Sequence, residues 1–178
     1  MSTSFSSPAL PDLERLRKQA KALLRAARDG DAKSLEQIRG ARTDAASASR
    51  PLKLADAQLA LARELGFASW PKLVAAREAL DLEAFRDAVT KLDAPRLARL
   101  LELPHVRIHI DDPLFDFGQR ATHIGASDRA VLELLLDAGA DADGRSDWEQ
   151  GPFTVLDRAD EPTVRYLLAR GAALTPNV

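Results

Sequence analysis

The residues best suited to chemistry lie in one short segment, where polar side chains alternate with apolar ones. One side of the alternation carries His105, Arg107, His109 and Asp111, and Asp112 follows directly. A period of two is typical of a strand, which would present these polar groups on one face. Imidazole and carboxylate groups on a shared face could hold a metal ion. An exposed polar strand face would have the same residue pattern. Because no further His or Cys cluster completes a site, we expect no bound metal.

No catalytic motif accompanies these residues. The chain has no cysteine, which excludes thiolate catalysis and cysteine-ligated zinc. It also lacks a glycine-rich phosphate loop, a His-Glu-x-x-His motif and a Gly-x-Ser-x-Gly motif. We therefore expect neither an enzyme nor a cofactor. Distant residues can still assemble a site without leaving a local motif. One alternative thus stays open, an enzyme or small-ligand site under residues 102–119, built around His109, Asp112, Phe115, Arg120 and His123.

A leucine-rich phrase that ends in Gly-Ala occurs twice near the C-terminus. Residues 131–140 read VLELLLDAGA, and residues 163–172 read TVRYLLARGA. The apolar spacing predicts a helix in each, with Gly139 and Gly171 just past the helix ends. Matching positions recur upstream at residues 24, 55, 86, 123 and 156, in steps of 31, 31, 37 and 33. Steps of this length indicate stacked supersecondary repeats.

The signals for helix starts repeat as well. Proline falls in the first turn of three predicted helices, at Pro71, Pro95 and Pro162, each time two positions after a Ser or Asp that can cap the helix. Proline costs little there because the first turn has no hydrogen-bond partner for its missing N–H. Near the N-terminus, the apolar spacing predicts a helix from Leu13 that Gly30 ends.

A period near 33, a small-residue first helix, a Leu-Leu second helix and a Gly-Ala exit resemble the ankyrin repeat. Residues 118–126 read GQRATHIGA, beside the family's Gly-x-Thr-Pro-Leu-His-x-Ala-Ala. Gly118 and His123 match, whereas residues 120–122 replace the Thr-Pro-Leu core. The resemblance implies that His123 braces the turn between units. Residues 54–73 also look like a segment found ahead of the repeats in many bacterial ankyrin-type proteins, which indicates a bacterial source.

The resemblance implies an all-α fold, an ankyrin-type helical solenoid of about four to five helix-turn-helix units with short β-hairpin-like fingers. One repeat domain would span residues 12–178, after a disordered tail at 1–11. Its units would lie near residues 13–40, 41–79, 80–110, 111–143 and 144–178. The implied function is a non-enzymatic protein–protein interaction module that binds through a concave surface of fingers and first helices.

The candidate partner-binding residues lie in and beside the two predicted fingers. They are Asp112, Phe115, Phe117, Arg120, Trp148 and Glu149. A tryptophan in a polar loop can bury a large area on binding, so Trp148 is the best anchor among them. Alternatively, the Trp148 ring folds back onto the stack, and Phe115 and Phe117 pack beneath the enlarged loop.

Composition narrows the class of partner and the compartment. The formal net charge is −2, and the basic residues near the N-terminus, among them Arg15 and Lys18, are interleaved with acidic ones. Because no unbroken basic face is predicted, we expect no nucleic-acid partner.

Residues 1–11 hold no apolar run long enough for a signal peptide or a membrane span. We expect a monomeric cytoplasmic protein with an unidentified protein partner. The Ser-rich stretch at 2–7 leaves a second alternative, an exported bacterial effector.

Overall fold

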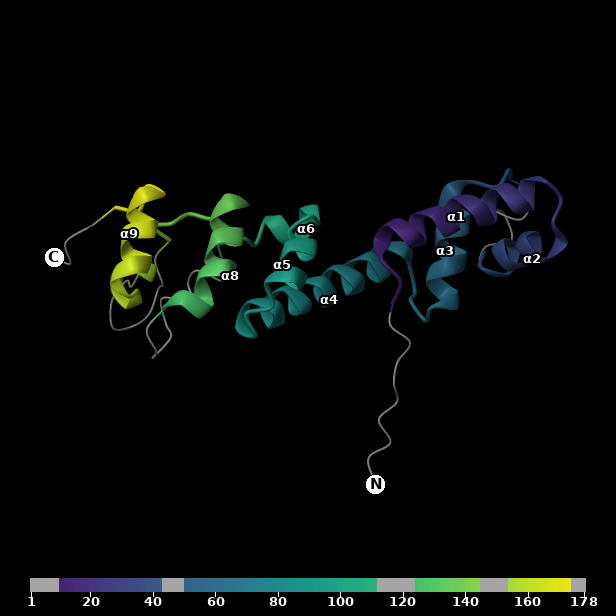
Figure 1. Ribbon diagram of the computed structural model, residues 1–178. Helices are drawn as coiled ribbons and strands as arrows, with labels where there is room; N and C mark the ends of the chain where they lie inside the picture. Colours follow the sequence, from purple (N-terminus) through teal and green to yellow (C-terminus); the bar gives the residue numbers. More distant parts are fainter. Residues whose placement is uncertain (1–9, 43–49, 112–123, 145–153, 174–178) are drawn as a thin grey trace, which may run out of the picture. The chain divides into compact units, whose positions relative to one another are not determined.

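The computed structural model describes residues 10–42, 50–111, 124–144 and 154–173 (Figure 1). The regular secondary structure in these ranges is helical. The β-structure there is an isolated bridge between Ile124 and Ala159. The prediction of an all-α fold is therefore confirmed. The helices are α1 (Leu13–Arg28), α2 (Ala32–Gly40), α3 (Leu54–Glu64), α4 (Trp70–Thr90), α5 (Ala94–Leu100), α6 (Pro104–Arg107), α8 (Ala126–Asp137), the 3₁₀ helix η2 (Val155–Arg158) and α9 (Glu161–Ala169).

Contacts between residues divide the chain into two compact units, residues 1–79 and residues 80–178. In a stack of repeats each unit contacts only its neighbours, so such a division also occurs within one repeat domain. The single domain predicted for residues 12–178 stays a prediction.

In the N-terminal unit, α1 packs against both α2 and α3. Its apolar stripe is buried as its spacing predicts, with Leu16 and Ala20 fully covered. Small residues of α3 meet it, among them Ala57 and Ala62, which are also fully buried. Alanine on facing helices allows the backbones to approach closely, and larger side chains such as Leu16 and Ile38 fill the rest of the core.

Helix ends follow one pattern in both units. Gly139 and Gly171 lie just past α8 and α9 with positive φ angles of 104° and 96°. The N–H groups of Ala140 and Ala172 reach back to the carbonyls of Leu135 and Leu167. This is the Schellman arrangement, which satisfies carbonyl groups that the helix leaves without partners. The predicted helix ends are confirmed.

Leu92 takes the same place after α4 without being a glycine. Its φ angle is +56°, its N–H bonds to the Val89 carbonyl, and the Asp93 N–H bonds to the Ala88 carbonyl. The left-handed region is costly for a residue with a Cβ. Leu92 also packs against the core of the C-terminal unit, and that packing offsets part of the cost.

We expect Leu92→Gly to be more stable than Leu92→Ala by about 1 kcal/mol. Both variants lose the packing of the leucine, but only alanine keeps the backbone strain. The exposed helical position Ala75 is the control, because Ala75→Gly should lower the free energy of unfolding by about 1 kcal/mol. Urea unfolding followed by circular dichroism gives both differences. An alanine variant as stable as the glycine variant at position 92 would contradict the strain.

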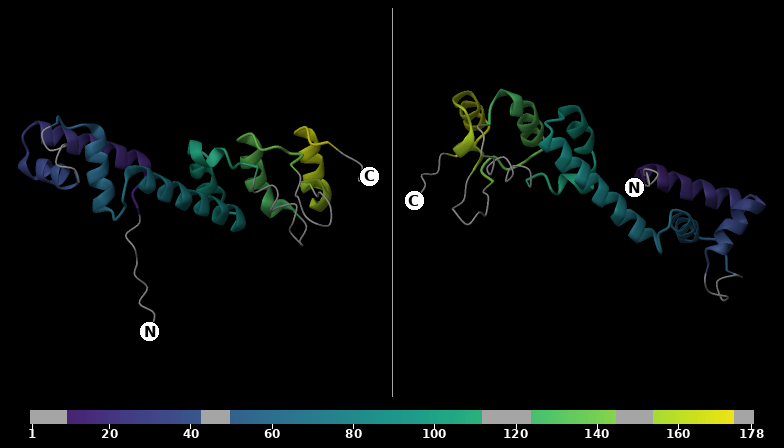
Figure 2. Two further views of the ribbon diagram at one scale, coloured as in Figure 1. Left: turned by 180° about the vertical axis from the view of Figure 1, so that it is seen from behind. Right: turned by 90° about the horizontal axis from the view of Figure 1, so that it is seen from below.

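The C-terminal unit repeats one link between successive segments. The Asp141 N–H donates to Asp111 Oδ1 at 2.8 Å, and the Ala173 N–H donates to Asp143 Oδ1 at 2.7 Å. Both partners of the second link lie 32 positions after those of the first. The helices involved, α8 and α9, lie side by side in every view (Figures 1 and 2). This repetition supports the predicted period independently of any family motif.

The strand predicted over residues 105–111 is wrong. Pro104 begins the short helix α6, and hydrogen-bonded turns follow it. Val106 and Ile110 are buried, whereas Ile108 between them is 79% exposed. Apolar residues four positions apart share a helical face, so this segment satisfies a helical pattern as well as an alternating one. The neighbouring helices bury that helical face.

The first β-hairpin-like finger, predicted within residues 102–119, is not confirmed, because its described part, residues 102–111, forms α6 and turns, and the rest lies outside the described residues. The second finger, predicted over residues 143–152, lies mostly outside the described residues. Val155, predicted in the first helix of the last unit, begins the 3₁₀ helix η2 instead. The predicted cap of the following helix, α9, is confirmed, because the Asp160 carboxylate accepts a hydrogen bond from the Thr163 N–H.

Candidate functional site

The residues that the sequence proposes for partner binding lie outside the described part of the structure. They are Asp112, Phe115, Phe117, Arg120, Trp148 and Glu149. His123, which the sequence assigns to a bracing role or to a ligand site, also lies outside it. Of the alternative ligand site, His109 alone is described, and it is half-buried. Those hypotheses remain sequence-based.

The histidine and carboxylate segment is arranged differently from the predicted strand face. His105 sits in α6 and lies against Asp81 of α4, with 3.0 Å between its Nε2 and a carboxylate oxygen. Both side chains are mostly buried. Within the described ranges, no three His, Cys, Asp or Glu side chains are placed to hold a metal ion. The pair therefore fastens α6 to α4.

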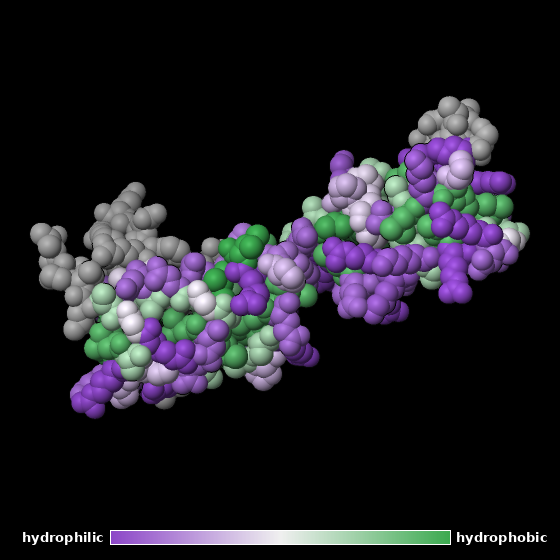
Figure 3. All heavy atoms as spheres, turned by 90° about the horizontal axis from the view of Figure 1, so that it is seen from above, coloured by the Kyte–Doolittle hydropathy of each residue, from purple (hydrophilic) through white to green (hydrophobic). Residues whose placement is uncertain are grey.

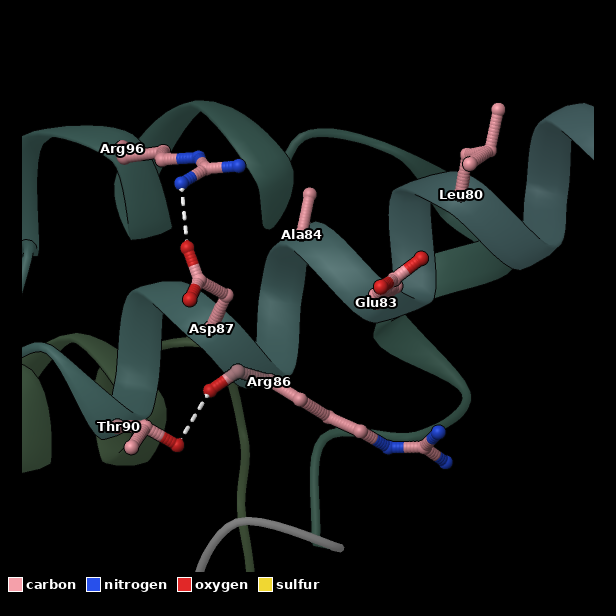
Figure 4. Close-up of a pocket in the computed structure, with 7 residues that line it drawn as sticks. All are labelled: Leu80, Glu83, Ala84, Arg86, Asp87, Thr90 and Arg96. Atoms are coloured by element: carbon pink, nitrogen blue, oxygen red, sulfur yellow. Dashed lines mark hydrogen bonds and ion pairs between the residues drawn. The ribbon is translucent and has the colours of Figure 1, made fainter. Parts of the chain in front are cut away.

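An open groove of about 620 Å³ lies on the second half of α4 and the start of α5 (Figure 4). Its lining residues are Leu80, Glu83, Ala84, Arg86, Asp87, Thr90 and Arg96. Leu80, Ala84 and Asp87 are spaced by four and three positions, which places them on one helical face. Figure 4 shows Leu80 and Ala84 pointing the same way from the helix. The floor of the groove is thus apolar, and Leu80 is 42% exposed on it.

Charged groups form one end of the groove. Arg96 Nη1 donates to Asp87 Oδ2 at 2.8 Å, and Lys91 Nζ lies 2.8 Å from Asp87 Oδ1. The hydrogen bond from Lys91, helped by both positive charges, lowers the pKa of Asp87. Arg96 uses one N–H on this contact out of five donors, so it can bind a further acceptor. The end of the groove therefore combines a fixed carboxylate with a guanidinium.

The hydroxyl group in the groove is already engaged. Thr90 Oγ1 donates to the backbone carbonyl of Arg86 at 2.8 Å, and no histidine lines the groove beside it. Nucleophilic catalysis requires a nucleophile within hydrogen-bond reach of a base. The groove offers an exposed leucine, a small alanine and charges, which suit recognition of another surface.

Sequence analysis missed this groove. Leu80 lies seven positions after Leu73, which is fully buried, and residues spaced by seven share a helical face. The spacing therefore predicts that Leu80 is a core residue. No residue type in the groove is unusual, and Arg96 meets Asp87 only because α5 folds back on α4.

No family model, curated protein or solved structure matches this chain. The ankyrin resemblance thus rests on the motifs and period of the sequence itself. In the described ranges no helix combines the length and the apolar character needed to cross a membrane.

Proposed function

We propose that this protein is a non-enzymatic protein-interaction module and that the groove on α4 is part of its binding surface. The observation that carries the proposal is the exposed Leu80 on an apolar floor beside the Asp87–Arg96 pair. An apolar anchor position next to charged groups is typical of the centre and rim of a protein interface.

The groove lies on a helix that crosses a predicted unit boundary, because α4 is continuous from Trp70 to Thr90 and that boundary falls between residues 79 and 80. The third unit of the predicted repeat has its first helix around residue 86, in the second half of α4. In the ankyrin repeats that the chain resembles, first helices and fingers together form the binding surface. We infer that the groove and the six finger residues named from the sequence serve the same partner, and, from the resemblance of residues 54–73, that they do so in a bacterial cytoplasm.

The test begins with affinity capture of a partner and mass spectrometry, followed by calorimetric titration of variants. Leu80→Ala is expected to weaken binding at least about tenfold, because an interface anchor is worth about 2 kcal/mol or more. Leu168→Ala is the matched control, since Leu168 is exposed to a similar degree, 37% against 42%, but lies on α9, away from the groove.

Trp148→Ala and Arg120→Ala test the sequence-based half of the surface and are expected to weaken binding by a similar factor. Melting curves of all variants should match the unmodified protein. Equal affinities for Leu80→Ala and Leu168→Ala would exclude the groove, and unchanged affinities for all four variants would exclude the whole surface.

A further inference from the structure

The two units of the chain carry opposite charge. Residues 1–79 contain 14 Lys and Arg against 9 Asp and Glu, a formal charge of +5. Residues 80–178 contain 11 Lys and Arg against 18 Asp and Glu, a formal charge of −7. The overall charge of −2 hides this division. A strong difference in charge between the two parts of a chain indicates a charged binding partner.

The positive charge is concentrated on the solvent side of α1. We call Arg17, Lys21, Arg25 and Arg28 the basic face, because steps of four and three align them along one side of α1, next to its buried stripe. All four side chains are exposed, and hydrophilic side chains cross this unit in Figure 3. Among the described residues, no carboxylate pairs with Arg17 or Lys21.

Folding accounts for only part of this face: Arg28 Nη2 donates to the Leu52 carbonyl at 2.8 Å, and Arg25 and Arg28 lie in the last turn of α1, where the helix dipole favours positive charge. Like charges four positions apart destabilise a helix by a few tenths of a kcal/mol per pair, and Arg17, Lys21 and Arg25 form two such pairs. Glu14 compensates only Lys18, at 2.6 Å. Asp29 lies 3.8 Å from Arg25. The face therefore carries a small cost in stability that an anionic partner would offset.

The C-terminal unit presents a matching line of carboxylates, which we call the acidic edge. Asp111, Asp141 and Asp143 follow one another through hydrogen bonds. Asp111 accepts from the Asp141 N–H, Asp141 accepts from the Asp143 N–H, and Asp143 accepts from the Ala173 N–H. Each bond uses one oxygen, and within the described ranges no other donor meets the second oxygen of these carboxylates. Asp111 and Asp141 are exposed.

We propose that the basic face of one chain binds the acidic edge of a second copy, so that chains associate head to tail. Every chain carries both surfaces in equal number. Nucleic acid would be attracted to the basic face but repelled by the −7 unit, whereas a second copy carries both a basic and an acidic surface. Complementary charge steers association and is screened by salt. Such a heterologous contact joins chains into rings or open filaments, and the mean mass rises with concentration. The monomer expected from the sequence is then the high-salt state.

Sedimentation velocity of the full chain tests the proposal. At about 10 mM ionic strength, where charges interact over about 30 Å, the mean mass should rise with protein concentration. At about 1 M, where that distance falls to about 3 Å, the mass should return to one chain. A mass of one chain at every concentration at low ionic strength would overturn the proposal.

Two variants locate the contact. R17E/K21E reverses half of the basic face, and D111N/D141N/D143N removes the charge of the acidic edge while each asparagine oxygen still accepts its N–H. Each variant should raise the apparent dissociation constant at least about tenfold. If R17E/K21E fails to fold, the asparagine variant still decides, because its backbone links are kept.

The controls change charge equally elsewhere. K33E/K72E alters two exposed lysines outside α1, and E102Q/E133Q/E161Q removes three carboxylates away from the acidic edge. Both should associate like the unmodified protein, and an equal loss in either control would overturn the assignment. A fluorescent single-stranded oligonucleotide is added as a probe. If the unmodified protein binds it, R17E/K21E does not, and sedimentation of the two is the same, the basic face serves nucleic acid and the proposal is wrong.

Discussion

Replacing Asp56 by alanine is expected to lower the free energy of unfolding by about 3–5 kcal/mol, because it removes the carboxylate from a buried ion pair. Asp56 sits in the first turn of α3 and is 4% exposed. Its carboxylate accepts from Arg42 Nη2, Arg50 Nη2 and the Lys53 N–H, each at 2.7 Å. The Arg42 side chain is only 5% exposed, so water cannot replace the lost carboxylate there.

Arg50→Ala is the matched control for Asp56→Ala. The Arg50 side chain is 44% exposed, and a partly exposed ion pair contributes about 0–1 kcal/mol. Urea unfolding of both variants, followed by circular dichroism, compares the two losses. If Asp56→Ala costs no more than Arg50→Ala, the buried pair with Arg42 does not hold the N-terminal unit together.

The same carboxylate makes stability depend on acid. Burial by itself raises the pKa of Asp56, but hydrogen bonds from Arg42 and the Lys53 N–H, together with the charges of Arg42 and Arg50, outweigh it and lower that pKa. A lowered pKa in the folded state gives stability that is present above the unfolded value, about 3.9, and that is lost as the pH falls through the folded value. The stability difference between the unmodified protein and Asp56→Asn should therefore be constant near neutral pH and shrink in acid. A difference that is the same in acid and at neutral pH would contradict this linkage.

Sequence alone predicted those parts of the fold that depend on local signals. Gly30 and Asp160 act where they were expected because caps and helix exits depend on a few neighbouring residues. The segment around Ile108 was wrong because apolar residues at 106, 108 and 110 fit a strand and a helix alike, and only packing decides which of them is buried.

The candidate surfaces depend on residues distant in the chain. Arg42 follows α2 and bonds to Asp56 in α3, and Arg96 in α5 bonds to Asp87 in α4. Because each pair joins two different elements, neither pair forms a local sequence motif. The opposite charges of the two units were readable from the sequence once the boundary at residue 79 was known. Without that boundary, the sequence shows only the sum of the two charges, a net charge of −2.

Leu135→Ala is expected to lower the free energy of unfolding by about 2–5 kcal/mol, through lost transfer free energy and an unfilled cavity. Leu135 is fully buried and belongs to a core that also contains Val131 of α8, Ile124 before α8 and Leu167 of α9. Its carbonyl still accepts the Ala140 N–H in the variant, so the helix end is unchanged and the loss measures packing alone.

Arg165→Ala on α9 is the contrasting change, expected to stay within about 0.5 kcal/mol of the unmodified protein. Its side chain is 77% exposed and, among the described residues, pairs with Glu161, four positions earlier on the same helix. Urea melts of both variants test the assigned faces of the two C-terminal helices together. Equal losses would mean that the Leu-Leu helices do not bury the side that their spacing predicts, and the repeat would then lack the apolar spine on which stacking depends.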